Sequence, residues 1–348
     1  MTAVDRPLKP TLAAVASEAG VSAPTVSKVL NGREDVAAGT RAKVLEALEH
    51  TGYKSPQQRK NAAGRTTVVE VVVDALQSAY VVEVLSGVLE YAAASDVEIL
   101  LNVTGLQRAA ALSPERRAQR MVDEGRGGLI VVTSAFGSAQ LDAFHRRQIP
   151  VVVIDPINPP PGDVVSVGAS NWAGGKAATA HLLDLGHRRI AFLGGTEAAE
   201  CNQARLHGYM AALMAEGVPV DEQLIRQGRF RPESGVEGLK ALMGLGRMPT
   251  AVFAASDSIA LGVLTEARRQ GIRVPEDLSL VGFDGTYQAE ESVPALTSVA
   301  QPLHEMGRAA LRFVLRQLRG DELDSRRVEL ATHLVVREST APPAVSRP

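Results

Sequence analysis

Cysteine is nearly absent from this sequence, with Cys201 its single instance in 348 residues. One thiol cannot form an internal disulfide or a cysteine-rich metal site, so a disulfide-stabilised domain and a cysteine-rich metal-binding domain are both excluded. Aromatic residues make up only 4% of the chain, which predicts an aliphatic core. No apolar run approaches the roughly 18 residues that a membrane-spanning helix needs. Residues 1–7 contain no apolar stretch of the kind that a secretory signal requires. We therefore expect a soluble, cytoplasmic protein.

Net charge is also small, at −2, but the charges are unevenly spread. Residues 1–66 carry 10 Lys and Arg against 6 Asp and Glu, whereas 67–348 carry 27 against 33. A basic head on an acidic body indicates contact with nucleic acid. Hydrophobic residues at 45% and charged residues at 22% are ordinary for a globular chain. At about 150 residues per domain, the length predicts two or three units.

The first 50 residues have apolar positions at helical spacing and no strand-like alternation. Thr11, Ser22 and Thr40 stand where N-caps are expected, since their hydroxyls can accept bonds from free backbone N–H groups. We predict three helices in a head spanning residues 10–55, followed by a polar, basic hinge at 56–66. The three apolar stripes are Leu12, Val15, Ala16 and Ala19; Val26, Val29 and Leu30; and Val44, Leu45 and Leu48.

Residues 67–340 alternate short β-branched runs with amphipathic stretches, which predicts an α/β fold with doubly wound parallel sheets. There are enough units for two lobes, with a crossing between them expected near Pro156–Val164. The expected strands are 68–73, 98–103, 129–133, 151–155, 190–193, 251–255, 278–282 and 333–336. The expected helices are 81–94, 114–124, 175–185, 204–216, 234–243, 258–270 and 303–318.

Residues 12–31 have the spacing of a helix-turn-helix. A close helix crossing needs a small residue such as Ala16, the turn needs a positive φ at Gly20, and Val15 and Val26 close the corner. Pro24 is tolerated because a first-turn N–H has no helical partner. An ordinary helical hairpin has the same generic pattern, so spacing alone leaves both interpretations open.

Several longer segments resemble the lactose-repressor (LacI/GalR) family, in the same order and through nearly the whole chain. That resemblance implies a dimeric, cytoplasmic regulator of transcription with a head, a hinge and a two-lobed core like a periplasmic sugar-binding protein. The segments are 21–32, 40–44, Gly52–Tyr53, 185–192, 205–209, 254–262, 274–284 and 296–301.

The resemblance implies that the second helix of the head lies in the major groove of operator DNA. Ala23, Pro24 and Lys28 match base-reading positions, and Lys28 can donate to guanine. Thr25, Ser27 and Asn31 match positions that hold the backbone or the groove edge, although each of these side chains can also be a surface filler. The complete expected DNA-binding set is Thr11, Leu12, Ser22, Ala23, Pro24, Thr25, Ser27, Lys28, Asn31 and Arg59.

The hinge departs from the family pattern. Where relatives carry a leucine that wedges into the minor groove, a gap-free alignment places Ala62, which cannot fill an opened base step. The usual hinge proline is shifted to Pro56. We therefore expect less operator bending and a different role for the polar residues of the hinge, with the backbone or minor groove as their target: Gln57, Gln58, Arg59, Lys60 and Asn61.

The cleft between two such lobes is a general site for small molecules. The resemblance implies a mono- or oligosaccharide effector, bound by carboxylates, amides and a planar guanidinium that pair with hydroxyls, and by an aromatic ring that stacks on the sugar. The expected effector-binding residues are Asp155, Trp172, Arg205, Phe230, Ser256, Asp257, Asp284 and Gln301.

Alternative roles exist for several of these side chains. Asp257 can instead cap the helix that follows it, Phe230 can belong to the core, and Trp172 can line a subunit interface. Cys201 matches a position that often carries a ligand-facing hydroxyl, yet most lone cysteines only pack. His187 is expected in a loop.

We expect no enzyme, no cofactor and no metal site, because no dinucleotide fingerprint, Walker loop, nucleophile elbow or metal-ligand spacing occurs. A secreted sugar-binding protein would share the core but would lack the basic helical head. The favoured function is a homodimeric repressor of carbohydrate-utilisation genes, released from its operator by a small sugar. The sequence does not choose between an inducer and a corepressor.

Overall fold

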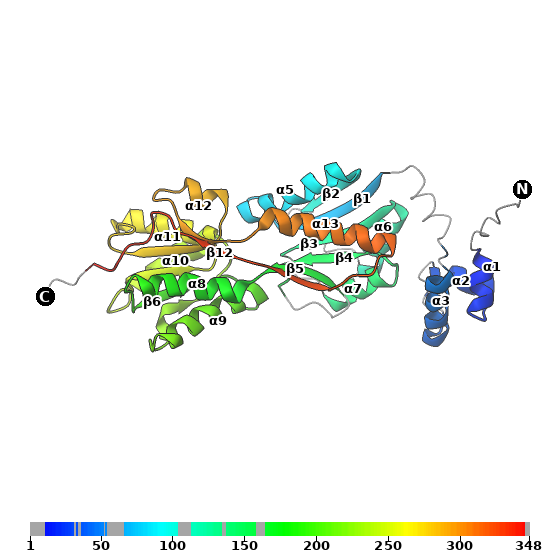
Figure 1. Ribbon diagram of the computed structural model, residues 1–348, viewed down its shortest axis with the longest axis horizontal. Helices are drawn as coiled ribbons and strands as arrows, with labels where there is room; N and C mark the ends of the chain where they lie inside the picture. Colours follow the sequence, from blue (N-terminus) through cyan, green and yellow to red (C-terminus); the bar gives the residue numbers. More distant parts are fainter. Residues whose placement is uncertain are drawn as a thin grey trace, which may run out of the picture.

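A computed structural model describes residues 11–30, 33, 36–51, 53, 66–103, 113–133, 137–157 and 164–344, without the side chain of Glu49. Within these ranges a helical head precedes two six-stranded sheets that are covered by helices (Figure 1). The expected fold class is therefore confirmed.

The head consists of α1 (Leu12–Glu18), α2 (Ala23–Leu30) and α3 (Ala38–Thr51). Val15 and Val26 are fully buried at the helix corner. The turn between α1 and α2 passes through Gly20 at a φ of +63°, a conformation that favours glycine. The helix-turn-helix geometry that the spacing predicted is present.

Two of the three expected caps are found. The Thr11 Oγ1 accepts a hydrogen bond from the backbone N of Ala14 at 3.2 Å, and the Ser22 Oγ accepts one from Thr25 at 3.4 Å. The third expectation is wrong, because α3 begins two residues before Thr40 and the Thr40 N–H already donates to a backbone carbonyl. Leu45, expected in the apolar stripe of α3, is 37% exposed.

The first lobe is an all-parallel sheet in the order β11-β5-β4-β3-β1-β2. Alternate residues of β1 enter two separate apolar clusters. Val71 packs with α5 and α13 on one face, whereas Val72 packs with α6 and α7 on the other. This two-sided burial accounts for the continuous apolar run in the sequence. The elements are β1 (Thr67–Val73), α5 (Ala79–Ala94), β2 (Val97–Val103), α6 (Pro114–Asp123), β3 (Arg126–Val132), α7 (Ser138–His145), β4 (Val151–Ile154), β5 (Val165–Ala169), α13 (Leu303–Arg319) and β11 (Arg327–Leu330).

The second lobe has the strand order β12-β10-β9-β8-β6-β7, with only the β10–β12 pair antiparallel. Helices α8 and α9 pack together so closely that a Cβ on Gly175 would lie 2.3 Å from the carbonyl oxygen of Arg205. The elements are α8 (Asn171–Asp184), β6 (Ile190–Leu193), α9 (Glu200–Ala215), a 3₁₀ turn (Glu222–Leu224), β7 (Ile225–Arg226), α10 (Pro232–Met243), β8 (Ala251–Ala254), α11 (Asp257–Gln270), β9 (Ser279–Asp284), α12 (Tyr287–Glu291), β10 (Thr297–Ala300) and β12 (His333–Val335).

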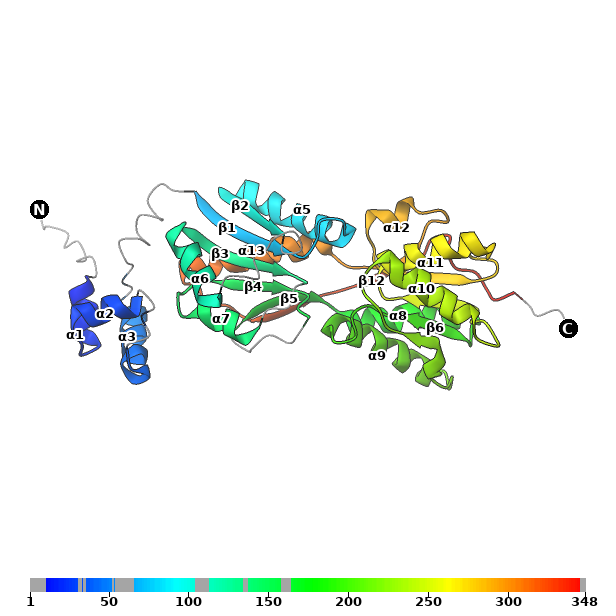
Figure 2. The ribbon, with the colours of Figure 1, turned by 180° about the vertical axis from the view of Figure 1, so that it is seen from behind.

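The expected crossing near Pro156–Val164 is wrong. After β4 the chain returns to the same sheet as β5, where Val152 and Val165 pair, and it leaves the first lobe only after Ala169. In the described residues it crosses again after β10 and once more between β11 and β12, and Figure 2 shows these connections from behind. Periodicity missed β5, β10 and β11 because these strands are short and mix polar with apolar residues.

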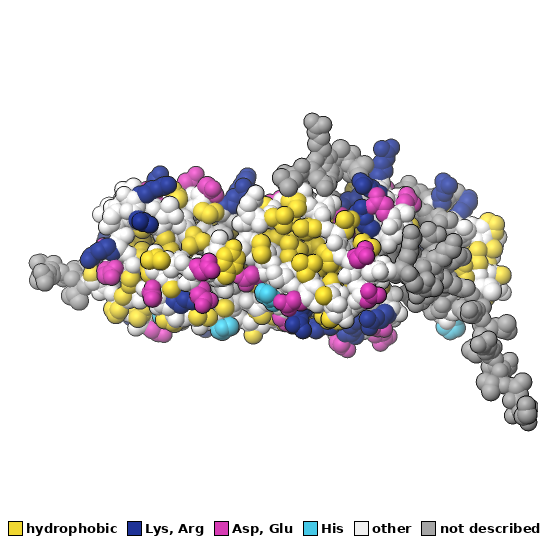
Figure 3. Space-filling model, turned by 90° about the horizontal axis from the view of Figure 1, so that it is seen from above, with side chains coloured by type: hydrophobic (Ala, Val, Ile, Leu, Met, Phe, Trp, Pro, Cys, Tyr) yellow, Lys and Arg dark blue, Asp and Glu magenta, His cyan; other side chains and the backbone are white. Residues whose placement is uncertain are grey.

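One face of the first lobe exposes apolar side chains on α5 and on the neighbouring edge strand β2. Val82 is 41% exposed and Leu89 is 53% exposed on α5, and Leu101 of β2, which pairs with Val71 on the side of the sheet that α5 covers, is also exposed. Figure 3 shows hydrophobic side chains gathered over the middle of the face that carries α5. Apolar side chains that cluster in this way are typical of an interaction surface.

Candidate functional site

Two aspartates mark the ends of strands in opposite lobes. Asp155 follows β4 at a φ of +43°, and Asp284 ends β9 at a φ of +107°. Non-glycine residues rarely adopt these conformations, and they persist where the surrounding structure enforces them, often at functional sites. Both side chains are buried.

The carboxylate of Asp155 accepts a hydrogen bond from the Tyr80 hydroxyl at 2.7 Å. Burial raises the pKa of Asp155, while Arg205 and the bond from Tyr80 act in the opposite direction. Tyr80 lies in α5 of the first lobe and Arg205 in α9 of the second. The electrostatic influence of Arg205 on Asp155 therefore acts across the cleft between the lobes.

Arg205 is the centre of a buried polar network, with 2% of its surface exposed. Its Nε donates to the Asn171 Oδ1 at 2.8 Å, and its Nη1 donates to the carbonyl oxygen of Ala255 at 2.5 Å. The same Nη1 lies 3.4 Å from the Asp284 Oδ1. The guanidinium also stacks on Phe283, 3.8 Å from the ring centroid. These contacts hold the planar group in one orientation.

Gln301 completes this network from the connection after β10. Its Nε2 donates to the Asp284 Oδ1 at 2.8 Å, while its Oε1 is buried without a hydrogen-bond partner in the described part of the chain. Burial raises the pKa of Asp284 well above its ordinary value, and Arg205 opposes that rise. A buried acceptor without a donor is rare in folded proteins, and a ligand hydroxyl can supply the donor.

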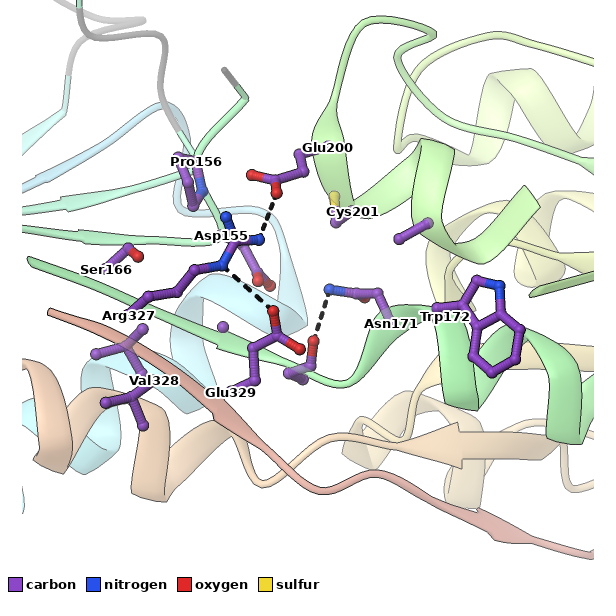
Figure 4. Close-up of a pocket in the computed structure, with 14 residues that line it drawn as sticks. Asp155, Pro156, Ser166, Asn171, Trp172, Glu200, Cys201, Arg327, Val328 and Glu329 are labelled. Atoms are coloured by element: carbon purple, nitrogen blue, oxygen red, sulfur yellow. Dashed lines mark hydrogen bonds and ion pairs between the residues drawn. The ribbon is translucent and has the colours of Figure 1, made fainter. Parts of the chain in front are cut away.

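A cavity of about 140 Å³ opens between the lobes beside this network. Asp155 and Trp172 line it together with residues of β5, α8, α9 and β11, whereas Arg205, Asp284 and Gln301 are buried and are not among the lining residues. Figure 4 shows Arg327 reaching from β11 toward Glu200 of α9, next to Asp155. The lining residues are Asp155, Pro156, Ser166, Val167, Gly168, Ala169, Asn171, Trp172, Glu200, Cys201, Ala204, Arg327, Val328 and Glu329.

Two of the expected effector residues, Ser256 and Asp257, make side-chain hydrogen bonds within the second lobe. The Ser256 Oγ caps α11 by accepting a bond from the Ile259 N at 3.2 Å. Asp257 accepts bonds from the backbone N and hydroxyl of Thr286 at 2.7 and 2.9 Å, and a third from Ser298 at 2.5 Å. Burial raises the pKa of Asp257 to about 6 despite these donors. Asp257 thus braces α11 against α12 and β10, Ser256 caps α11, and neither side chain lines the cavity.

The two expected aromatic residues differ in position. Phe230 is partly buried and packs against the core of the second lobe; its ring centroid lies 5.8 Å from the guanidinium of Arg205, and it does not line the cavity. Trp172 is 47% exposed at the start of α8, where the Lys176 Nζ lies 5.5 Å from its ring centroid. In Figure 4 its ring points away from Asp155, at the margin of the cavity.

The head presents its second helix with one face buried and one exposed. Val26 and Val29 face the interior, while Pro24 and Lys28 are exposed and Ser27 is half-buried on the other side. Ala23, Thr25 and Leu12 are partly exposed, and Thr11 and Ser22 are exposed. The expected contacts at Asn31 and Arg59, and the Ala62 departure, lie outside the described residues.

Comparison with known proteins agrees with this two-part organisation. Residues 11–56 match the family described as bacterial regulatory proteins, lacI family, and residues 179–340 match a periplasmic binding protein-like domain. Catabolite control protein A of Priestia megaterium is 32% identical over 94% of this chain and 98% of its own. The HTH-type transcriptional regulator CelR of Thermobifida fusca is 33% identical over 97% of this chain and all of its own.

The chain belongs to the lacI family of bacterial regulatory proteins. It is a DNA-binding regulator of transcription, as the resemblance implied, and its relatives are named as regulators, not as enzymes. A solved complex of the transcriptional regulator CelR with cellobiose is 32% identical, with a TM-score of 0.72 over 95% of this chain and 99% of that one. No helix in the described part of this lacI-family chain is long and apolar enough to cross a membrane.

The residues of the site that sequence reasoning missed in this lacI-family protein include Tyr80, Asn171, Glu200, Arg327 and Glu329. Asn171 had a signal, since it precedes the single tryptophan in a polar, glycine-rich stretch. Glu200 was missed because α9 begins four residues earlier than its apolar periodicity suggested. The Arg327–Glu200 contact joins residues 127 positions apart, and no local pattern encodes such a pair.

Proposed function

We propose that this protein is a homodimeric repressor of carbohydrate-utilisation genes that a small sugar releases from its operator. The observation that carries the sugar proposal is the mixture of groups around the cleft. Asp155, Glu200 and Glu329 line the cavity with acceptors, while Asn171 and Arg327 line it with side chains that can donate. Sugar hydroxyls donate and accept at once, so they match such a mixture. The cellobiose complex of CelR adds a related example.

Cavity size supports a small effector. The volume of about 140 Å³ is below the roughly 300–1,000 Å³ of pockets that hold drug-sized ligands. A monosaccharide-sized molecule therefore suits the present lobe arrangement. A disaccharide needs the lobes to separate further, and its differential affinity for the two arrangements would then shift the equilibrium between them.

The sugar proposal is tested by thermal shift and operator release with the full chain. The operator is first obtained by selection from a random DNA library, where a pseudo-palindromic site is expected. Glucose, cellobiose and adenine are then titrated, and a ligand at 100 times its Kd should add about 2.7 kcal/mol of stability. Release of operator by a sugar supports an inducer, and tighter binding identifies a corepressor. A response to adenine alone contradicts the sugar proposal.

Asp155→Asn tests the placement of the site. The amide keeps an oxygen that can accept the bond from Tyr80, but it removes the charge that faces the cavity. We expect a loss of at least tenfold in sugar affinity with operator affinity unchanged, because hydrogen bonds to charged groups contribute about 1.5–3 kcal/mol. Asp184→Asn, on the exposed end of α8, is the matched control. Equal sugar affinity in Asp155→Asn and the control contradicts the placement.

The dimer proposal rests on the exposed apolar stripe of α5 and β2. Val82 and Leu89 lie seven residues apart on one side of α5, and Leu101 of β2 is exposed on the side of the sheet that α5 covers. A second copy of this chain would remove these side chains from water. We expect Leu89→Lys to shift the protein toward monomers in analytical ultracentrifugation and to weaken operator binding. If the Leu89→Lys dimer is as stable as that of the wild type, the interface lies elsewhere on the protein.

A further inference from the structure

An ion pair joins the two lobes at the wall of the cavity. The Arg327 Nη2, on β11 of the first lobe, donates to the Glu200 Oε1 at the first residue of α9 in the second lobe (Figure 4). The Arg327 Nε lies 3.3 Å from the Oε1 of Glu329, two residues further along the same strand. Because Glu200 belongs to the other lobe, only the first of these bonds resists separation of the lobes.

The same end of α9 makes a second contact with the first lobe. The backbone N of Glu200 donates to the carbonyl oxygen of Ile157 at 3.2 Å. At another point of the cleft, the Glu83 carboxylate of α5 accepts a bond from the backbone N of Tyr287 at 2.8 Å. The lobes are thus in contact at the cavity wall and also near α12.

Helix α9 connects this ion pair to the site. After Glu200 the helix carries Cys201 and Ala204, which line the cavity, and then Arg205, the centre of the buried network. A helix moves as a rigid element, so displacement of its first turn from β11 widens the cavity and carries Arg205 away from Asp155. The Arg327–Glu200 pair is placed to control that displacement.

We propose that Arg327 is a positioning residue for the effector, because its ion pair with Glu200 holds α9 against the first lobe and sets how often the cavity opens. This inference rests on the proposed function of the cleft as the effector site. The side chains of Arg327 and Glu200 are 57% and 31% exposed, so water screens the pair. Exposed ion pairs are weak, and breaking this one should raise the open population about two- to fivefold.

Cys201 is a built-in reporter of opening. It is the single cysteine of the chain, it lines the cavity, and burial raises the pKa of its thiol to about 12. The side chain is half-buried in the cavity wall, and a thiol with a raised pKa reacts slowly, so we expect its reaction rate with a neutral reagent to rise with the open population. The experiment measures the iodoacetamide reaction rate of the full chain without any effector.

We expect Arg327→Gln and Glu200→Gln each to accelerate this reaction about two- to fivefold. The two substitutions change the charge near the thiol in opposite directions. Loss of a cation at 327 disfavours the thiolate, and loss of an anion at 200 favours it, so acceleration in both variants identifies opening and not a local electrostatic effect. The double variant should react no faster than the faster single one, since both changes break one contact.

Arg273→Gln is the matched control. It breaks an exposed ion pair with Asp277 that lies wholly within the second lobe, so the rate at Cys201 should not change. Equal thermal unfolding midpoints for all variants show that acceleration does not come from global unfolding. A rate in Arg327→Gln that is equal to or below that of the wild type overturns the proposal, as does equal acceleration by Arg273→Gln.

A glucose arm separates this inference from the proposed function. If the cleft takes a sugar that fits the present lobe arrangement, glucose should slow the reaction of Cys201 in the wild type and should do so less effectively in Arg327→Gln, where that arrangement is less populated. Acceleration by both substitutions without any protection by cellobiose, glucose or another sugar supports the ion-pair role and contradicts the sugar effector. Protection of equal strength in the wild type and Arg327→Gln, with no acceleration, supports the effector site and overturns the role of Arg327.

Discussion

Replacement of Arg205 by methionine should destabilise the second lobe strongly. Arg205 and Asp284 are 2% and 6% exposed, and their side chains meet at 3.4 Å. Methionine fills much of the same space but removes the positive charge. Among the described residues only Gln301 then still donates to the Asp284 side chain, and a buried carboxylate that has lost its cation costs about 3–5 kcal/mol.

A second variant separates the cost of the unpaired Asp284 charge from the cost of the hydrogen bonds that Arg205 no longer donates. In Arg205→Met with Asp284→Asn no unpaired anion remains, while Asn171 and Ala255 still lack their donor. Each acceptor left without a donor costs about 1–3 kcal/mol at most, and water entry reduces that cost. We expect the double variant to regain at least half of the stability that the single variant loses.

Urea unfolding followed by circular dichroism at pH 8 and pH 5 measures both effects. Arg205 opposes the rise that burial causes in the pKa of Asp284, so its removal raises that pKa in the folded state further above the unfolded value. The folded state then takes up a proton as the pH falls, and the destabilisation should be smaller at pH 5. A loss below about 1 kcal/mol in the single variant, or a double variant no more stable than the single one, refutes the reasoning.

Three further predictions concern other parts of the chain. Gly175→Ala should cost about 1–3 kcal/mol in thermal unfolding because its Cβ would clash with α9, whereas Gly246→Ala, with open space around it, should cost less than half as much. Burial lowers the pKa of His187, so the unfolded state binds more protons and the free energy of unfolding should decrease as the pH falls below about 6.5. His187→Gln should make the free energy of unfolding less dependent on pH in this range. If the slope against pH does not change, other groups cause the dependence. Lys28→Ala should cost about 1–3 kcal/mol at one operator base pair in a binding-site scan, while an equal loss on all DNA sequences makes Lys28 a phosphate contact.

The head could be predicted from sequence because its determinants are local. The turn at Gly20, the cap at Thr11 and the apolar corner of Val15 and Val26 all fall within 16 residues. The strands of the two sheets were also recognisable where both faces are buried, since a continuous β-branched run such as that of β1 is typical of a parallel strand covered on both sides. Asp155 and Asp284, which the family resemblance implied, lie at the ends of two such strands.

Contacts between distant segments were decided only by the tertiary structure. Sequence periodicity shows that β4 is a strand, but not that β5 returns beside it, and the first crossing was therefore misplaced. Asp257 has the same local setting whether it binds a ligand or braces α12, and only the positions of Thr286 and Ser298 distinguish the two roles. The Arg327–Glu200 pair depends on how two lobes close, because hydrophobic periodicity reports which face of an element is buried and not which distant side chain it meets.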